Sequence, residues 1–104
     1  ASWCGPCRSY NPVVVELYNR FKHTGFTVFS ISLDTDKEAW VKAIADDHLT
    51  WIHGSDMKGW GSQPARLYGV SAVPTTFLID RDGRLLEKNL HGDKLEKKLV
   101  ELLR

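Results

Sequence analysis

The only two cysteines of the chain, Cys4 and Cys7, are separated by two residues, and this spacing constrains the fold and the chemistry more than any other feature. A disulfide across so short a loop removes little freedom from the unfolded chain, so it is a poor structural staple. A zinc site needs four ligands, and the four histidines occur singly rather than as a second closely spaced pair. Covalent haem attachment requires His directly after the second cysteine, where this chain has Arg8. The spacing therefore favours a redox-active dithiol and no metal.

The residues around the cysteines give this dithiol a mechanism. Pro6 fixes φ at about −65° and suits the first turn of a helix, so a helix is expected to begin inside the motif with Cys4 at its N-terminal edge. Unpaired backbone N–H groups and the helix dipole favour a thiolate there, which makes Cys4 the attacking nucleophile. Cys7 lies one turn later on the same face and would resolve the mixed disulfide. Arg8 either adds positive charge nearby or is a solvated surface cation.

Length and composition indicate one soluble globular domain. With 104 residues the chain is expected to form a single domain, residues 1–104. Its 42% hydrophobic and 26% charged residues are typical of a globular chain with a modest core. The net charge of +1 argues against a nucleic-acid or anionic-membrane partner. No apolar run reaches the roughly 18–20 residues of a membrane-spanning helix, and residues 1–104 contain no pattern expected of a targeting signal.

The first half of the chain has the pattern of a helix followed by a buried strand. After the motif, apolar residues recur at helical spacing and predict a helix that ends near Gly25, with a kink at Pro12. Residues 26–33 are rich in β-branched and aromatic side chains with little alternation. This composition predicts a central parallel strand that is covered on both faces.

Capping and turn residues place the next elements. A capping-box pattern at Thr35 predicts a second helix to about Asp47, followed by a brief strand near residues 50–53. Trp40 on that helix is expected to be core. Ser62 is a fair N-cap for a short helix that Gly69 closes.

The last third of the chain predicts a hairpin and a final helix. Residues 77–80 and 85–88 flank a turn and are expected to pair as antiparallel strands. A second capping box at Asp93 predicts a helix with a buried stripe of Leu95, Leu99, Leu102 and Leu103. The whole order predicts an α/β fold with helices on both faces of a sheet.

These motifs also carry a family resemblance. The segment Ala-Ser-Trp-Cys-Gly-Pro-Cys at residues 1–7 resembles the active-site turn of thioredoxin-fold proteins, and Val73-Pro74-Thr75 resembles their cis-proline loop. The spacing is most similar to TlpA/ResA-type bacterial thiol–disulfide oxidoreductases, which are grouped with the AhpC/TSA superfamily. The resemblance spans nearly the whole chain. It implies a three-layer α/β/α sandwich with a mixed central sheet, and a cis peptide before Pro74 that faces the cysteine pair.

The sequence departs from that family at two places. Family members have a strand directly before the motif, and it lies between the strands that match residues 26–33 and 75–80. The domain is therefore expected to be incomplete at its N-terminus, with unpaired backbone in the middle of the sheet. Many relatives also carry Glu shortly after the motif, where this chain has Tyr10. No residue is assigned to proton transfer at Cys7.

The resemblance implies a reductase of protein disulfides that acts outside the cytoplasm, in the periplasm or cell envelope. Cys4 and Cys7 would be catalytic, and its partners would be protein thiol or disulfide substrates and an upstream electron donor. The expected substrate-binding residues are Trp3, Gly5, Pro6, Val73 and Pro74. Trp3 either shields the disulfide and touches substrate or only packs over the helix start. No cofactor is expected beyond the disulfide itself.

Two other functions stay open. A thiol peroxidase of the AhpC/TSA superfamily would need Thr three residues before the attacking cysteine, where this chain has Ala1. A non-catalytic peptide-binding module with the same fold would work without either cysteine. A group of aromatic residues, Trp51, His53 and Trp60, would then be either a docking surface or a structural cluster.

Overall fold

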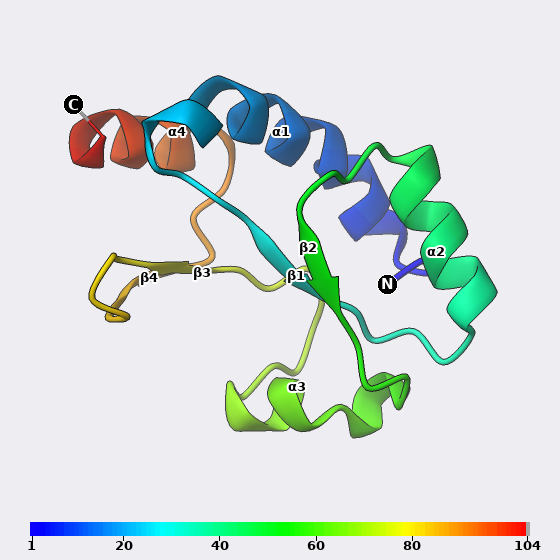
Figure 1. The fold of residues 1–104 in the computed structure, drawn as a ribbon. Coiled ribbons are helices and arrows are strands. Elements are labelled where there is room, and N and C mark those ends of the chain that lie inside the picture. Colours follow the sequence, from blue (N-terminus) through cyan, green and yellow to red (C-terminus); the bar gives the residue numbers. More distant parts are fainter. Residues whose placement is uncertain (104) are drawn as a thin grey trace.

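Helices and short strands alternate along residues 1–103, which the computed structural model describes (Figure 1). The helices are α1 (Gly5–Phe21), α2 (Lys37–Asp46), α3 (Gln63–Leu67) and α4 (Gly92–Leu102). The strands are β1 (Phe29–Ile31), β2 (Ile52–Gly54), β3 (Phe77–Ile79) and β4 (Leu85–Lys88), and two 3-10 turns are η1 (Lys22–Thr24) and η2 (Gly59–Gly61). None of the described helices is both long and apolar enough to cross a membrane.

The first helix begins inside the cysteine motif, as predicted. Cys4 is the N-cap of α1, and its sulfur accepts a hydrogen bond from the Cys7 amide at 3.2 Å. The helix continues through Pro12, and η1 follows it to Gly25, whose φ of 106° is the left-handed conformation that ends many helices. The two cysteines are therefore fixed to the end of a long helix.

The strands form two separate two-stranded sheets, with the gap between them that the expected missing strand would leave. In one, β1 pairs with β2 in parallel, with Phe29 opposite Ile52. In the other, β3 pairs with β4 in the predicted antiparallel hairpin. Among the described residues no strand joins β1 to β3, and a sheet is continuous only where each strand bonds to the next. The α/β class is confirmed, and the sheet is interrupted between β1 and β3, where the missing strand was expected.

The prediction of a strand covered on both faces was wrong. β1 has three residues rather than eight, and Phe29 exposes 59% of its surface. Ile31 is exposed on the same strand, as is Ile52 on the neighbouring strand β2. Within residues 1–103 these side chains are only partly covered, so the composition of a buried strand is present without the full cover that it predicts.

The packing of α1 against α4 supplies part of the core. α1 and α4 lie side by side, while α3 lies across the strands from them (Figure 1). Leu17 of α1 and Leu99 of α4 are buried, and an ion pair between Arg20 and Glu96 links the two helices. Trp51 is buried against Tyr18, with its ring centroid 5.2 Å away, so it belongs to the core.

Two of the predicted helix caps differ in the structure. Asp36, not Thr35, caps α2, because its carboxylate accepts hydrogen bonds from two first-turn amides. Asp93 lies in the first turn of α4, and the N-cap position is occupied by His91 without a side-chain hydrogen bond. Ser62 caps α3 as predicted. The capping-box pattern found the right turns but missed the capping residue twice.

Burial along α4 generates a stability prediction. Leu99 is 2% exposed, whereas Leu102 of the predicted stripe is 46% exposed. We expect Leu99→Ala to lower the free energy of unfolding by about 2–5 kcal/mol, because a buried cavity replaces the side chain. The matched control Leu102→Ala should change it by less than about 1 kcal/mol. Urea denaturation of both variants measures this, and equal losses would contradict the packing described.

Candidate active site

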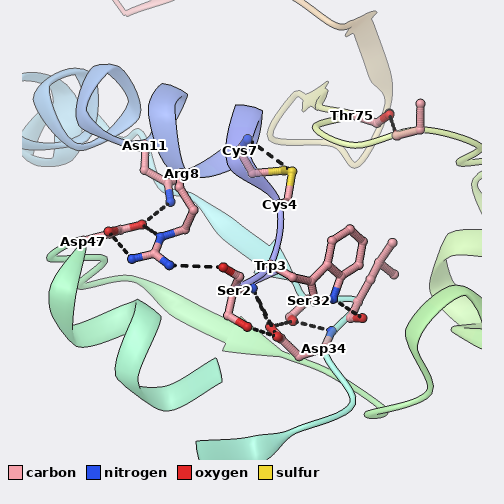
Figure 2. Close-up of a disulfide and its surroundings, with 12 residues drawn as sticks. Ser2, Trp3, Cys4, Cys7, Arg8, Asn11, Ser32, Asp34, Asp47 and Thr75 are labelled. Atoms are coloured by element: carbon pink, nitrogen blue, oxygen red, sulfur yellow. Dashed lines mark hydrogen bonds and ion pairs between the residues drawn. A yellow bond between two sulfur atoms is a disulfide. The ribbon is translucent and has the colours of Figure 1, made fainter. Parts of the chain in front are cut away.

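Cys4 and Cys7 form a disulfide at the N-terminal end of α1, with their Cα atoms 5.2 Å apart (Figure 2). Cys4 is only 4% exposed and Cys7 is half-buried. The amide of Cys7 points at the Cys4 sulfur, and the N-terminal end of a helix favours negative charge. This position, rather than exposure, makes Cys4 the better thiolate after reduction.

The aromatic residues near the pair separate into an exposed set and a buried set. Trp3 directly precedes Cys4, is half-exposed, and donates its indole N–H to the Leu33 carbonyl oxygen at 3.3 Å. Trp60 is also half-exposed, and its ring centroid lies 6.3 Å from that of Trp3. Trp51 instead stacks on His53 in the interior. The sequence grouping of Trp60 with those two residues was therefore wrong, and its neighbour is Trp3.

A glycine holds Trp60 in this place. Gly59 begins η2 with a φ of 56°, and a Cβ there would lie 3.1 Å from the Thr35 methyl group. Only glycine combines this backbone angle with so close an approach. The turn that carries Trp60 is thereby packed against the residues that follow β1.

The other predicted substrate-binding residues lie in two segments. Gly5 and Pro6 are exposed in the first turn of α1. The peptide bond between Val73 and Pro74 is cis, as the resemblance implied, and both residues are half-buried. That this loop faces the cysteine pair stays a prediction.

A buried carboxylate fixes the residues before the cysteines. Asp34 follows β1, is 1% exposed, and accepts the Ser2 amide at 3.0 and 3.1 Å (Figure 2). The hydroxyls of Ser2 and Ser32 donate to the same carboxylate. Burial opposes ionisation, but the hydrogen bonds from Ser2 and Ser32 outweigh it and hold the pKa of Asp34 below its usual value. We call this group the Asp34 clasp.

A second carboxylate holds the first turn of α1 to the end of α2. Arg8 forms an ion pair with Asp47, and its guanidinium also donates to the Ser2 carbonyl oxygen at 3.1 Å. Asn11 donates to the Asp47 carboxylate at 2.8 Å. The hydrogen bond from Arg8 is the main cause that lowers the pKa of Asp47, and it raises the pKa of Arg8. Arg8 is thus neither a free cation nor fully solvated.

Sequence reasoning missed both carboxylates as parts of the site. Their partners lie 32 and 39 residues away in the chain, so no local spacing reveals them. The one available signal was that Asp34, a charged residue, directly follows the apolar run of residues 26–33. Tyr10, at the position of the relatives' Glu, accepts a hydrogen bond from the Gly92 amide at 2.8 Å and contacts His91 edge-on. It connects α1 to the start of α4.

Comparisons with known proteins agree on one family. The profile of the Redoxin family matches residues 1–103. A thiol-disulfide oxidoreductase from Bacteroides fragilis has a similar structure, with a TM-score of 0.92 and 38% identity, over 99% of this chain and 76% of that one. Nucleoredoxin of Danio rerio is 33% identical over 85% of this chain and 21% of its own length. Thiol-disulfide oxidoreductase ResA of Bacillus thuringiensis is 29% identical over 99% of this chain. The chain spans 57% of the length of that ResA.

The ion pair at Asp47 predicts a pH-dependent stability. Because its folded pKa is lowered, Asp47 stabilises the fold above its unfolded-state pKa of about 3.9, and this stability is lost as pH falls through the folded pKa. Asp47→Asn should be about 1 kcal/mol less stable at pH 7. It should also lose less stability than the parent chain between pH 7 and pH 3. Urea denaturation at both pH values measures this, with the exposed turn residue Asp82→Asn as control. An undiminished pH dependence would contradict the assignment.

Proposed function

The chain belongs to the Redoxin family and is a ResA-like domain of thioredoxin fold, and from this premise we propose that it reduces disulfide bonds in polypeptides. The observation that carries the proposal is the Cys4–Cys7 pair at the start of α1, with the Cys7 amide directed at the Cys4 sulfur. A helix terminus lowers the pKa of such a thiol, and the thiolate is the species that attacks a disulfide. The named relatives, thiol-disulfide oxidoreductases from Bacteroides and Bacillus, support the same chemistry.

The reaction proceeds in two exchanges. The Cys4 thiolate attacks one sulfur of the substrate disulfide, forms a mixed disulfide, and releases the other substrate sulfur as a thiolate that takes a proton. Cys7 then loses its proton and attacks the Cys4 sulfur. The Cys4–Cys7 disulfide forms and the second substrate sulfur leaves as a thiolate. The substrate gains two electrons, and the pair gives up two.

The direction of electron flow requires a donor. The oxidised pair has to be returned to the dithiol by an external dithiol protein, which is itself oxidised to a disulfide. The Gly5-Pro6 sequence between the cysteines resembles that of reductants, which supports this direction. We place the reaction outside the cytoplasm, since disulfides persist in oxidising compartments and the ResA-type resemblance implies the cell envelope.

The substrate polypeptide would lie across the exposed residues around the disulfide. The residues proposed to bind it are Trp3, Gly5, Pro6, Val73 and Pro74. Trp60 joins this set, because its ring lies beside that of Trp3 and is similarly exposed. Two exposed indoles offer a large apolar contact area at a small cost in side-chain entropy, so they suit apolar side chains that flank a substrate cysteine.

The order of the two exchanges predicts opposite behaviour for two variants. Cys7→Ser should attack a peptide disulfide once and remain joined to it through Cys4, because no second thiol resolves the adduct. Cys4→Ser should form no adduct at that step and show no turnover. Mass spectrometry under non-reducing conditions measures the adduct, and reduction of a peptide disulfide by a dithiol measures turnover.

The control is the double variant Cys4→Ser/Cys7→Ser, which should be inert. Peptide binding and function that survive in this double variant would contradict the redox proposal and favour a binding module. Rapid peroxide consumption by the parent chain, without peptide reduction, would favour a peroxidase.

The aromatic pair predicts a selective loss. Trp60→Ala should lower kcat/KM for a peptide disulfide with apolar flanking residues by about tenfold, equivalent to about 1.4 kcal/mol, mainly through KM. Reduction of hydroxyethyl disulfide, which is too small to reach the indole, should be unchanged. The control is Leu67→Ala, which removes an exposed apolar side chain from α3. A loss of similar size for both disulfides would contradict a substrate-binding role for Trp60.

A further inference from the structure

Asp34 carries a buried charge that is held by hydrogen bonds rather than by an ion pair with a side chain. Its side chain is 1% exposed, and all of its hydrogen-bond donors are neutral: the amide and hydroxyl of Ser2 and the hydroxyl of Ser32. Among residues 1–103 no Lys, Arg or His side chain forms an ion pair with it. The charge of the other carboxylate near the motif, Asp47, is offset by Arg8. Asp34 therefore contributes a negative charge near the motif, whereas the Asp47–Arg8 pair is close to neutral.

The charge of Asp34 lies close to the cysteine pair. Ser2 is bound to the carboxylate and precedes Cys4 by two residues, so the carboxylate lies within about 10 Å of the Cys4 amide even for extended backbone. The backbone here is turned rather than extended, because the Cys4 amide donates to the Ala1 carbonyl oxygen at 3.1 Å. Buried charges at this separation are screened much less than exposed ones.

The other charged side chains near the motif are paired or exposed to solvent, and the exposed ones include Asp36 and Lys37 at the start of α2. On α1 the nearest is Arg8, which is paired with Asp47 at the end of α2. In the segment before η2, Asp56 accepts the Lys58 and Gln63 amides, and Lys58 is exposed to solvent. These groups are either paired or screened by water. The cations that attract the Asp34 carboxylate are the Ala1 ammonium and the Arg8 guanidinium, and neither forms an ion pair with it.

We propose that Asp34 is a positioning residue that keeps the Cys4–Cys7 pair reducing, because its buried carboxylate, with which no side chain of residues 1–103 forms an ion pair, opposes the charge that reduction creates. Reduction of the disulfide takes up two electrons and, with Cys4 as a thiolate and Cys7 as a thiol, one proton. It therefore adds one negative charge beside Asp34. A fixed negative charge disfavours the reduced state and lowers the reduction potential. The inference rests on the proposed function for the redox role of the pair.

The test is Asp34→Asn, which retains an acceptor for the Ser2 amide and removes the charge. Equilibration with a dithiol–disulfide buffer gives the redox constant, and the pH profile of alkylation by iodoacetamide gives the pKa of Cys4. We expect the constant to shift about three- to tenfold toward the dithiol, the larger value being about 30 mV for a two-electron couple. The alkylation profile should move to lower pH, because the thiolate is no longer opposed.

Two controls separate charge from geometry. Asp82→Asn removes an exposed carboxylate in the turn between β3 and β4, and Ser2→Ala removes one hydrogen bond but keeps the Asp34 charge. Both should change the constant by less than about twofold. The proposal is overturned if Asp34→Asn leaves the redox constant unchanged or makes the pair more reducing. It is also overturned if either control shifts the constant as much as Asp34→Asn does.

A second variant keeps the test decisive if Asp34→Asn does not fold. Thr35 is exposed and next in sequence, so Thr35→Lys brings a cation near the carboxylate without touching the Asp34 clasp. At low salt it should also shift the constant toward the dithiol, and no shift overturns the proposal. These measurements use no polypeptide substrate. A failure here is therefore distinct from a failure of the proposed function, which Cys7→Ser reports.

Discussion

The structure depends on the way one serine is held from two sides. Asp34 binds the amide and hydroxyl of Ser2, while Arg8, itself paired with Asp47, binds the Ser2 carbonyl oxygen. These contacts attach the start of α1 to the end of β1 and to the end of α2. Cys4 is two residues further on, so its place at the helix terminus follows from them. Removing either carboxylate releases one side of the motif.

This attachment matters because the strands supply little of the framework. The structure has two separate two-stranded sheets, and apolar side chains of β1 and β2 are exposed. Short sheets of this kind are marginally stable alone. The packing of α1 against α4 and the burial of Trp51 therefore supply much of the stability of the fold. The redox motif lies at the start of the helix that takes part in both.

Local features could be predicted from the sequence, and long-range ones could not. The start of α1 at Cys4, the cap at Ser62 and the hairpin follow from residues a few positions apart, and all are confirmed. The gap between the two sheets was expected from the family resemblance alone, because composition does not specify which backbones pair in a ladder. The Asp34 clasp spans 32 residues, and no pattern in the sequence pairs Asp34 with Ser2. Fold class and the cysteine pair were thus predictable, whereas the groups that tune the pair required the structure.

The reduction potential of the Cys4–Cys7 pair tests the central claim most directly. The chain is equilibrated in a series of thiol–disulfide buffers, and the fluorescence of Trp3, next to the disulfide, reports the fraction reduced. If the pair is a reductant and the Asp34 carboxylate disfavours its reduced state, its reduction potential should be near that of thioredoxin, about −270 mV. A value near about −120 mV would identify an oxidant that introduces disulfides, and would contradict both the direction of electron flow and the role of Asp34.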